Sequence, residues 1–134
     1  MGGFGELLHN FGGETNNFNF ISKVIYMYQA HLVSINSARE NALVGKLIPD
    51  GIRATWIGGK RVCTGCNEWT WTDGTPWDFE NWQTGEPNDT GGIENVVEID
   101  GGDANYGWND QDENQTTKRT FVCSKTLSGM NEAI

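Results

Sequence analysis

The chain has 134 residues and a formal net charge of −9, and this length suits one domain with one hydrophobic core. The negative charge argues against binding to nucleic acid or to an anionic membrane surface, because both need clustered lysine and arginine. No apolar run approaches the ~20 residues that a membrane-spanning helix needs, and residues 1–6 lack the basic and apolar regions of a secretion signal.

The first part of the chain predicts an irregular segment, a helix and a strand. Residues 1–19 are rich in glycine and asparagine, so an irregular or edge segment is expected there. Residues 20–30 carry apolar side chains at the i, i+3, i+4 spacing of an amphipathic helix. These side chains belong to Phe20, Ile21, Val24, Ile25 and Tyr28. A short strand is predicted directly after this helix, over residues 31–35.

A second helix is predicted over residues 38–48. Ser37 and Glu40 have the spacing of a capping box, in which each side chain satisfies an unpaired backbone amide of the first turn. The helix is expected to bury Leu43 and Leu47, and the Pro-Asp-Gly sequence at residues 49–51 ends it.

The second half of the chain predicts short strands separated by loops. Strands are expected over residues 55–57, 69–71, 95–99, 107–109 and 120–124. The two-residue period of a strand places Trp69 and Trp71 on one face, and residues 72–74 form a turn. The tryptophans are expected to be core or loop anchors rather than platforms for sugar rings. Residues 75–95 show no periodicity, and a loop of this length inside a compact domain is usually functional.

The three cysteines leave two readings of the Cys63–Cys66 pair. A redox CxxC motif would need a helix after it, but residues 67–71 alternate like a strand. A zinc site would need two more cysteines or histidines nearby, and both histidines lie well upstream. The pair is therefore expected to form a local disulfide or to remain as two thiols.

The acidic residues are concentrated in one segment. Residues 73–112 contain eleven Asp or Glu residues and no Lys or Arg, so this segment needs either extensive solvation or a cation. Glu86 and Asn88 flank Pro87, and a cis Glu86–Pro87 bond would project both side chains to the same side. Glu94 precedes one predicted strand, and Asn109 and Asp110 end another. Carboxylate and amide oxygens without thiol or imidazole favour calcium over zinc or a transition metal.

Six short motifs, in this order along the chain, resemble the successive signatures of the C-type lectin domain. They are Trp56-Ile57-Gly58, Trp69-Thr70-Trp71-Thr72-Asp73-Gly74, Asn81-Trp82, Glu86-Pro87-Asn88, Glu94-Asn95 and Trp108-Asn109-Asp110. The resemblance runs from about residue 20 to residue 125. It implies an α+β fold with two helices, two small antiparallel sheets and a long calcium-binding loop region. The whole chain, residues 1–134, would be one carbohydrate-recognition domain with a C-terminal tail at residues 126–134.

The resemblance also implies a combined site for calcium and sugar. The implied ligands of both are Glu86, Asn88, Glu94, Asn109 and Asp110. Two neighbouring sugar hydroxyls would complete the calcium shell, donate hydrogen bonds to carboxylates and accept them from amide N–H groups. Glu before Asn around the proline is the family's order for mannose-type sugars, whereas Gln before Asp marks galactose.

This sequence departs from the family pattern in two respects. Cys123 matches the family's final-strand cysteine, but its partner position falls at or near Tyr26, and Cys63 and Cys66 are additional. A second calcium site would draw on Asp89 and Glu94. It is not expected here, because Arg61, Val62 and Gly65 stand where its other ligands should be.

The leading hypothesis is a non-enzymatic, calcium-dependent module that binds mannose-type glycans. By the resemblance, the domain would be extracellular or at a cell surface, and several copies presented together would raise its avidity. The alternative is a calcium-stabilised domain that binds a protein or ice surface without sugar. A glycosidase is not expected, because no carboxylate stands in apolar surroundings and no nucleophile–histidine pair is visible.

Overall fold

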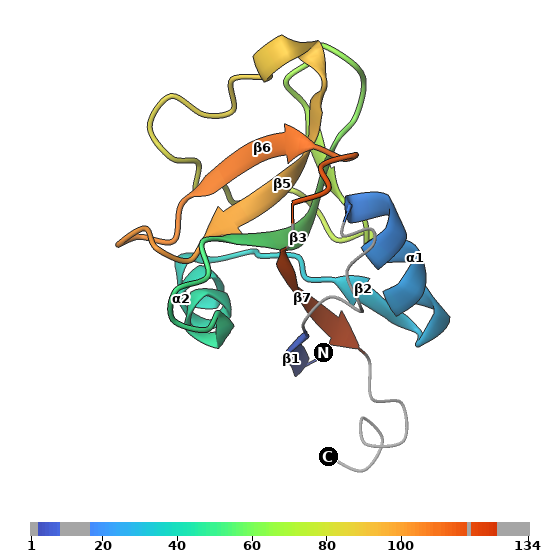
Figure 1. Cartoon of the computed structure of the whole chain (residues 1–134), viewed down its shortest axis with the longest axis vertical. Coiled ribbons are helices and arrows are strands. Elements are labelled where there is room, and N and C mark those ends of the chain that lie inside the picture. Colours follow the sequence, from blue (N-terminus) through green and yellow to red (C-terminus); the bar gives the residue numbers. More distant parts are fainter. Residues whose placement is uncertain (1–2, 9–16, 118, 126–134) are drawn as a thin grey trace.

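The structure, a computed structural model, describes residues 3–8, 17–117 and 119–125. Its elements are β1 (Gly3–Leu8), α1 (Phe18–Met27), β2 (Ala30–Leu32), α2 (Ala38–Leu47), β3 (Ala54–Arg61), β4 (Trp69–Trp71), η1 (Thr90–Gly92), β5 (Glu94–Asp100), β6 (Trp108–Asp112) and β7 (Thr120–Lys125). Figure 1 shows the long loop between β4 and β5 at the end of the molecule away from β1. In the described ranges, no helix is long and apolar enough to cross a bilayer.

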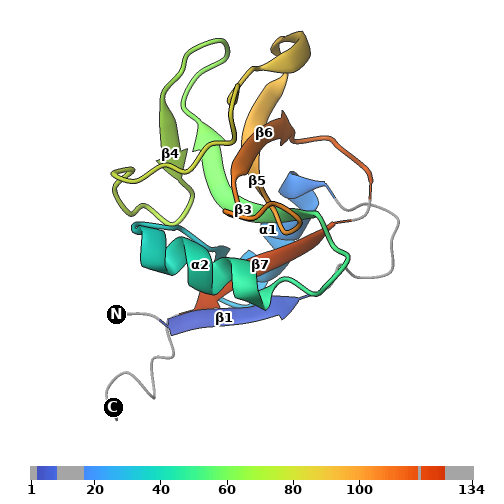
Figure 2. The same ribbon diagram turned by 90° about the vertical axis from the view of Figure 1, so that its left-hand side faces the viewer.

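The strands form one mixed sheet. The main path runs β1-β7-β3-β5-β6, with β2 added to β7 and β4 added to β3. The α+β prediction is confirmed, but the expected division into two antiparallel sheets is not. The long strand β3 joins both regions, because its first half pairs in parallel with β7 at Thr55 and Trp56, and its last residues pair with β4 at Gly59–Arg61. Figure 2 shows β4 and β7 at opposite ends of β3.

The N-terminal segment contains an edge strand, which is one of the two possibilities that the sequence left open for residues 1–19. Gly3–Leu8 forms the edge strand β1, which pairs antiparallel with β7. Glycine and asparagine do not favour a strand, and the partner of β1 lies more than a hundred residues away in sequence. The local sequence therefore does not identify this strand. Residues 9–16 and the predicted tail at 126–134 lie outside the described residues.

Helix α1 begins two residues earlier than predicted because Asn17 caps it. The Asn17 side chain accepts a hydrogen bond from the Phe20 amide, which is the usual role of asparagine at this position. The buried face consists of Phe18, Ile21 and Ile25, and the Phe18 ring packs edge-on against Trp56. Two residues of the predicted stripe, Phe20 and Tyr28, are instead exposed.

Helix α2 has the predicted start but not the predicted buried face. Ser37 accepts from the Glu40 amide, while the Glu40 carboxylate accepts from the Asn36 amide, one residue before the cap. The buried residues are Asn41, Val44 and Gly45, whereas Leu43 is exposed and Leu47 is partly buried. The helix is rotated because the Tyr106 ring packs against Gly45 and leaves no room for a Cβ atom there.

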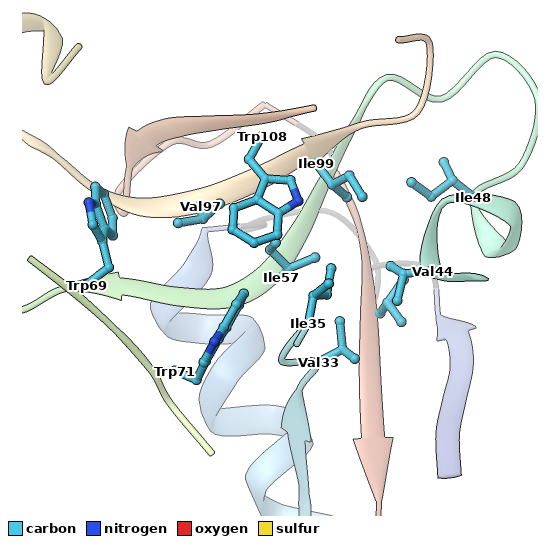
Figure 3. Packing of buried hydrophobic residues seen from close by; sticks show 11 residues of the cluster. Val33, Ile35, Val44, Ile48, Ile57, Trp69, Trp71, Val97, Ile99 and Trp108 are labelled. Atoms are coloured by element: carbon cyan, nitrogen blue, oxygen red, sulfur yellow. The ribbon is translucent and has the colours of Figure 1, made fainter. Parts of the chain in front are cut away.

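Among the described residues, one of two buried hydrophobic clusters forms a core between α2 and the strands β3 to β7, and it contains Trp69, Trp71 and Trp108 (Figure 3). Trp69 and Trp71 are buried on one face of β4 with Thr70 exposed between them, as predicted. The indole N–H of Trp108 donates to Asn41 Oδ1 at 2.7 Å. Trp77, Phe79 and Trp82 of the long loop pack against the same core, so the base of the loop is held by aromatic contacts.

Candidate functional site

The long loop is attached to β6 just before Glu86. The Trp108 amide donates to the Asn81 carbonyl, and the Gln83 amide donates to the Trp108 carbonyl, both at 2.9 Å. Asn81–Gln83 therefore runs beside the start of β6. This attachment brings residues 86–89 against the next residues of that strand, Asn109 and Asp110.

Asp110 is the centre of the site. Its side chain is fully buried, and its Oδ1 accepts from the Asn88 amide at 3.1 Å. Its Oδ2 accepts from the Asp89 amide at 2.7 Å. A β6 carboxylate thus holds the backbone of the loop directly after Pro87, and the Glu86–Pro87 peptide bond is cis, as the sequence prediction allowed.

Hydrogen bonds around one turn connect Glu86, Asn88 and Glu94. Asn88 Nδ2 lies 3.5 Å from Glu86 Oε2. The Thr90 amide donates to both Asn88 Oδ1, at 3.3 Å, and Glu94 Oε1, at 3.0 Å. Asp89 Oδ1 accepts from the Glu94 amide at 3.0 Å, which closes the turn onto the start of β5. Four of the five predicted ligands are therefore gathered in one place.

The carboxylates of this group repel one another. Burial, followed by interaction with the Asp110 and Glu94 carboxylates, raises the pKa of Glu86 to about 7. Burial and the Asp110 and Glu98 charges also raise the pKa of Glu94, against the Thr90 amide bond, which lowers it. Glu86 Oε1 is buried and has no hydrogen-bond partner among the described residues. Such a group would be stabilised by an added cation.

Asn109 makes its side-chain hydrogen bond outside the Asn88–Glu94 turn. It pairs with Glu98 across β5 and β6, and its Nδ2 donates to Glu98 Oε2 at 2.9 Å. Glu98 Oε1 in turn accepts from Arg119 Nε at 2.9 Å. Consecutive residues of a strand point to opposite faces, so Asn109 and the buried Asp110 leave β6 in different directions.

The donor set fits a calcium ion. The described residues contain no group of three or more His, Cys, Asp or Glu side chains that would hold a metal ion by themselves, and the Asp110 carboxylate already accepts three hydrogen bonds. A calcium ion would therefore also use amide and carbonyl oxygens, which it accepts readily because it takes six to eight oxygen ligands in flexible geometry. The unpartnered Glu86 Oε1 offers one such oxygen.

The sequence prediction missed two basic residues at the site, Arg61 and Arg119. Arg61 Nη2 lies 2.9 Å from Asp110 Oδ2, and Arg119 Nη2 lies 2.8 Å from Glu98 Oε1. The signal that points to them is charge balance, because buried carboxylates in a segment without Lys or Arg need cations from outside it. The two arginines flank that acidic segment in the sequence.

The nearby cysteines form a disulfide between Cys63 and Cys66, which decides between the two readings left open by the sequence. Cys123 is not part of it and lies buried in β7.

Comparison with known proteins identifies the family. A family model described as the lectin C-type domain matches residues 17–125. The chain belongs to this family. The fold agrees with this assignment: the cow C-type carbohydrate-recognition domain of CD23, solved in the presence of a GlcNAc2Man3 oligosaccharide, superposes with a TM-score of 0.72. It is 31% identical, and the match covers 92% of this chain and 85% of that one.

Two curated relatives of this chain differ in the function that their names state. Ladderlectin from Oncorhynchus mykiss is 36% identical over 84 residues, covering 60% of this chain and 43% of the relative. The type-2 ice-structuring protein of Hemitripterus americanus is 39% identical over 59 residues, covering 44% of this chain and 34% of the relative. The matches cover between 34% and 56% of the length of the first three curated relatives.

Proposed function

We propose that this domain binds mannose-type sugars in a calcium-dependent manner. The proposed ligands of the ion and the sugar are Glu86, Asn88, Glu94, Asn109 and Asp110. The observation that carries the proposal is the unpartnered buried oxygen of Glu86, set beside two further carboxylates and the Asn88 amide. The similarity to a carbohydrate-recognition domain solved with a mannose-containing oligosaccharide supports it.

The side chains have complementary roles in this proposal. Glu86 and Glu94 accept hydrogen bonds from sugar hydroxyls, and Asn88 and Asn109 donate N–H groups to the same hydroxyls, so each hydroxyl uses its donor and acceptor capacity. Asn109 keeps a second N–H for the sugar, because its amide has two and one is bonded to Glu98. A bound calcium ion supplies coordination to two neighbouring hydroxyls.

The proposed activity is binding without catalysis, outside the cell or at its surface. One sugar on one small site makes few contacts, so useful affinity requires several copies of the domain presented together. Glycans that repeat mannose-type residues on a cell surface are the matching partners.

The test exchanges the donor and acceptor that flank Pro87. The double variant Glu86→Gln with Asn88→Asp is expected to weaken retention on mannose-agarose and to gain some binding to galactose-agarose. Glu80→Gln is the matched control, because Glu80 lies in the same loop and its bond from the Trp77 indole can be kept by the glutamine oxygen. If the double variant keeps wild-type mannose binding while elution still requires EDTA, Glu86 and Asn88 are not the sugar contacts.

A second candidate function is binding to ice or to a protein surface without sugar. The observation that favours it is the 39% identity to a type-2 ice-structuring protein. Mannose-agarose separates the two functions, since retention that EDTA reverses is expected only of the sugar-binding domain. Thermal hysteresis of the purified protein, without retention on sugar columns, would establish ice binding instead.

A further inference from the structure

Arg61 is the last residue of β3, and its side chain lies in the candidate site, where it is only 3% exposed. Its Nε and Nη2 donate to the Glu94 carbonyl at 3.1 and 2.9 Å. Nη2 also donates to Asp110 Oδ2 at 2.9 Å, and Nη1 donates to the Cys66 carbonyl. The guanidinium group is therefore held by acceptors on three sides, which is the planar multi-donor geometry that lysine cannot reproduce.

The surroundings of Arg61 are those of a bound cation. Asp89 Oδ1 lies 3.8 Å from Nη2, so two carboxylates face the guanidinium in addition to the two carbonyl groups. The Trp69 ring covers it, with the guanidinium carbon 4.4 Å from the ring centroid. An aromatic face attracts a cation and excludes water from it.

Arg61 connects segments that are distant in sequence. It joins the end of β3 to the disulfide loop at Cys66, to the start of β5 at Glu94 and to β6 at Asp110. Asp110 is in turn bonded to the loop after Pro87, because its carboxylate accepts hydrogen bonds from the Asn88 and Asp89 amides. Arg61 is thus linked to the Asn88 backbone through one intermediate carboxylate.

We propose that Arg61 is an internal cation that organises the ligand loop before any metal ion binds. Its positive charge offsets the repulsion among Asp110, Asp89 and their acidic neighbours, so Asn88 and Asp89 are held in place in the calcium-free domain. Arg61 is a positioning residue in this role and does not touch the sugar. The inference concerns the order of the loop and holds whether or not the loop binds mannose.

Arg119 provides a matched control for an ordinary buried ion pair. Like Arg61, it is 7% exposed as a residue, pairs with a carboxylate and covers a tryptophan, here Glu98 and Trp56. In these contacts it does not reach the Asn88–Glu94 turn. Arg61→Met and Arg119→Met therefore both remove a buried arginine, but only the first removes the proposed organiser of the loop.

The test is amide hydrogen exchange by NMR in EDTA, read at Asn88 and Asp89 and compared with core amides of β5. In the wild type, both loop amides are expected to be protected. In Arg61→Met, their exchange is expected to rise about tenfold or more relative to the core, as for loss of hydrogen bonds to a charged group. In Arg119→Met, the ratio of loop to core exchange is expected to stay at the wild-type value.

Three outcomes would overturn the inference. They are unprotected Asn88 and Asp89 amides in the calcium-free wild type, an unchanged ratio in Arg61→Met, and an equal change in Arg119→Met. If Arg61→Met does not fold, Arg61→Lys takes its place, with partial loss of protection expected because lysine keeps the charge but not the bonds to several acceptors. Failure of the proposed sugar binding would be seen separately: the wild-type protein would not be retained on mannose-agarose, while its Asn88 and Asp89 amides would still be protected from hydrogen exchange.

Discussion

Replacing the Asp110 carboxylate by an amide is the sharpest test of how this site is held together. One carboxylate oxygen accepts from the Asn88 amide, and the other accepts from the Asp89 amide and from Arg61. In Asp110→Asn, an NH2 group replaces one of these oxygens and faces a donor, and the buried Arg61 loses its opposite charge. Removing one partner of a buried ion pair typically costs about 3–5 kcal/mol of unfolding free energy.

For a domain of this size, that loss corresponds to a melting temperature lower by about 10–20 °C. The measurement is urea and thermal unfolding in EDTA, so that calcium binding does not contribute. Arg53→Met is the control, because Arg53 also pairs with an aspartate, Asp100, at 2.7 Å, but its side chain is 71% exposed. An exposed pair of this kind contributes less than about 1 kcal/mol. If Asp110→Asn costs no more than Arg53→Met, the buried network does not hold the loop.

Three further predictions concern calcium, the core and pH. Calcium at one hundred times its dissociation constant is expected to add about 2.7 kcal/mol of stability, so an EDTA-insensitive melting curve would count against the calcium site. Asn41→Leu removes the partner of the Trp108 indole and of the Asn105 and Tyr106 carbonyls, and urea unfolding is expected to show a loss of about 2–5 kcal/mol, with Ala42→Leu on the exposed face near neutral. In EDTA, the raised pKa of Glu86 means that its protonation favours the folded state, with the full gain below about pH 4.5 and none above about pH 7. The melting temperature of the wild type relative to Glu86→Gln is therefore expected to fall as the pH rises from about 4.5 to about 7 and to level off above that, and parallel pH profiles would contradict this.

Local patterns in the sequence were sufficient to predict most of the helices and strands. The capping sequence of α2 and the Trp-Thr-Trp alternation of β4 depend on residues close together in the chain, and both are confirmed. The prediction that Leu43 is buried was wrong, because the rotation of α2 depends on contacts of Asn41 and Gly45 with the distant Tyr106 region. For the same reason, the sequence left open whether residues 1–19 are irregular or form an edge strand, since the partner of β1, β7, lies at the other end of the chain.

In the candidate site, too, some features follow from the local sequence and others follow only from strand pairing. Glu86, Asn88 and Glu94 are near one another in sequence, and the turn that gathers them follows from the local run of Pro, Asn and Gly. The use of Glu98 to orient Asn109 follows from the pairing of β5 with β6. No spacing rule reports that pairing.

The sequence by itself indicated the family, the oxygen-only donors of the candidate site and the segment in which those donors lie, because these depend on residue identity and order. Only the tertiary structure decided which positive charge faces the buried carboxylates. Arg61 stands twelve positions before Asp73, outside the acidic segment, and reaches Asp110 only because β3 lies between β4 and β5. Charge in a sequence can be counted, but the cation that a carboxylate contacts is set by strand order and burial.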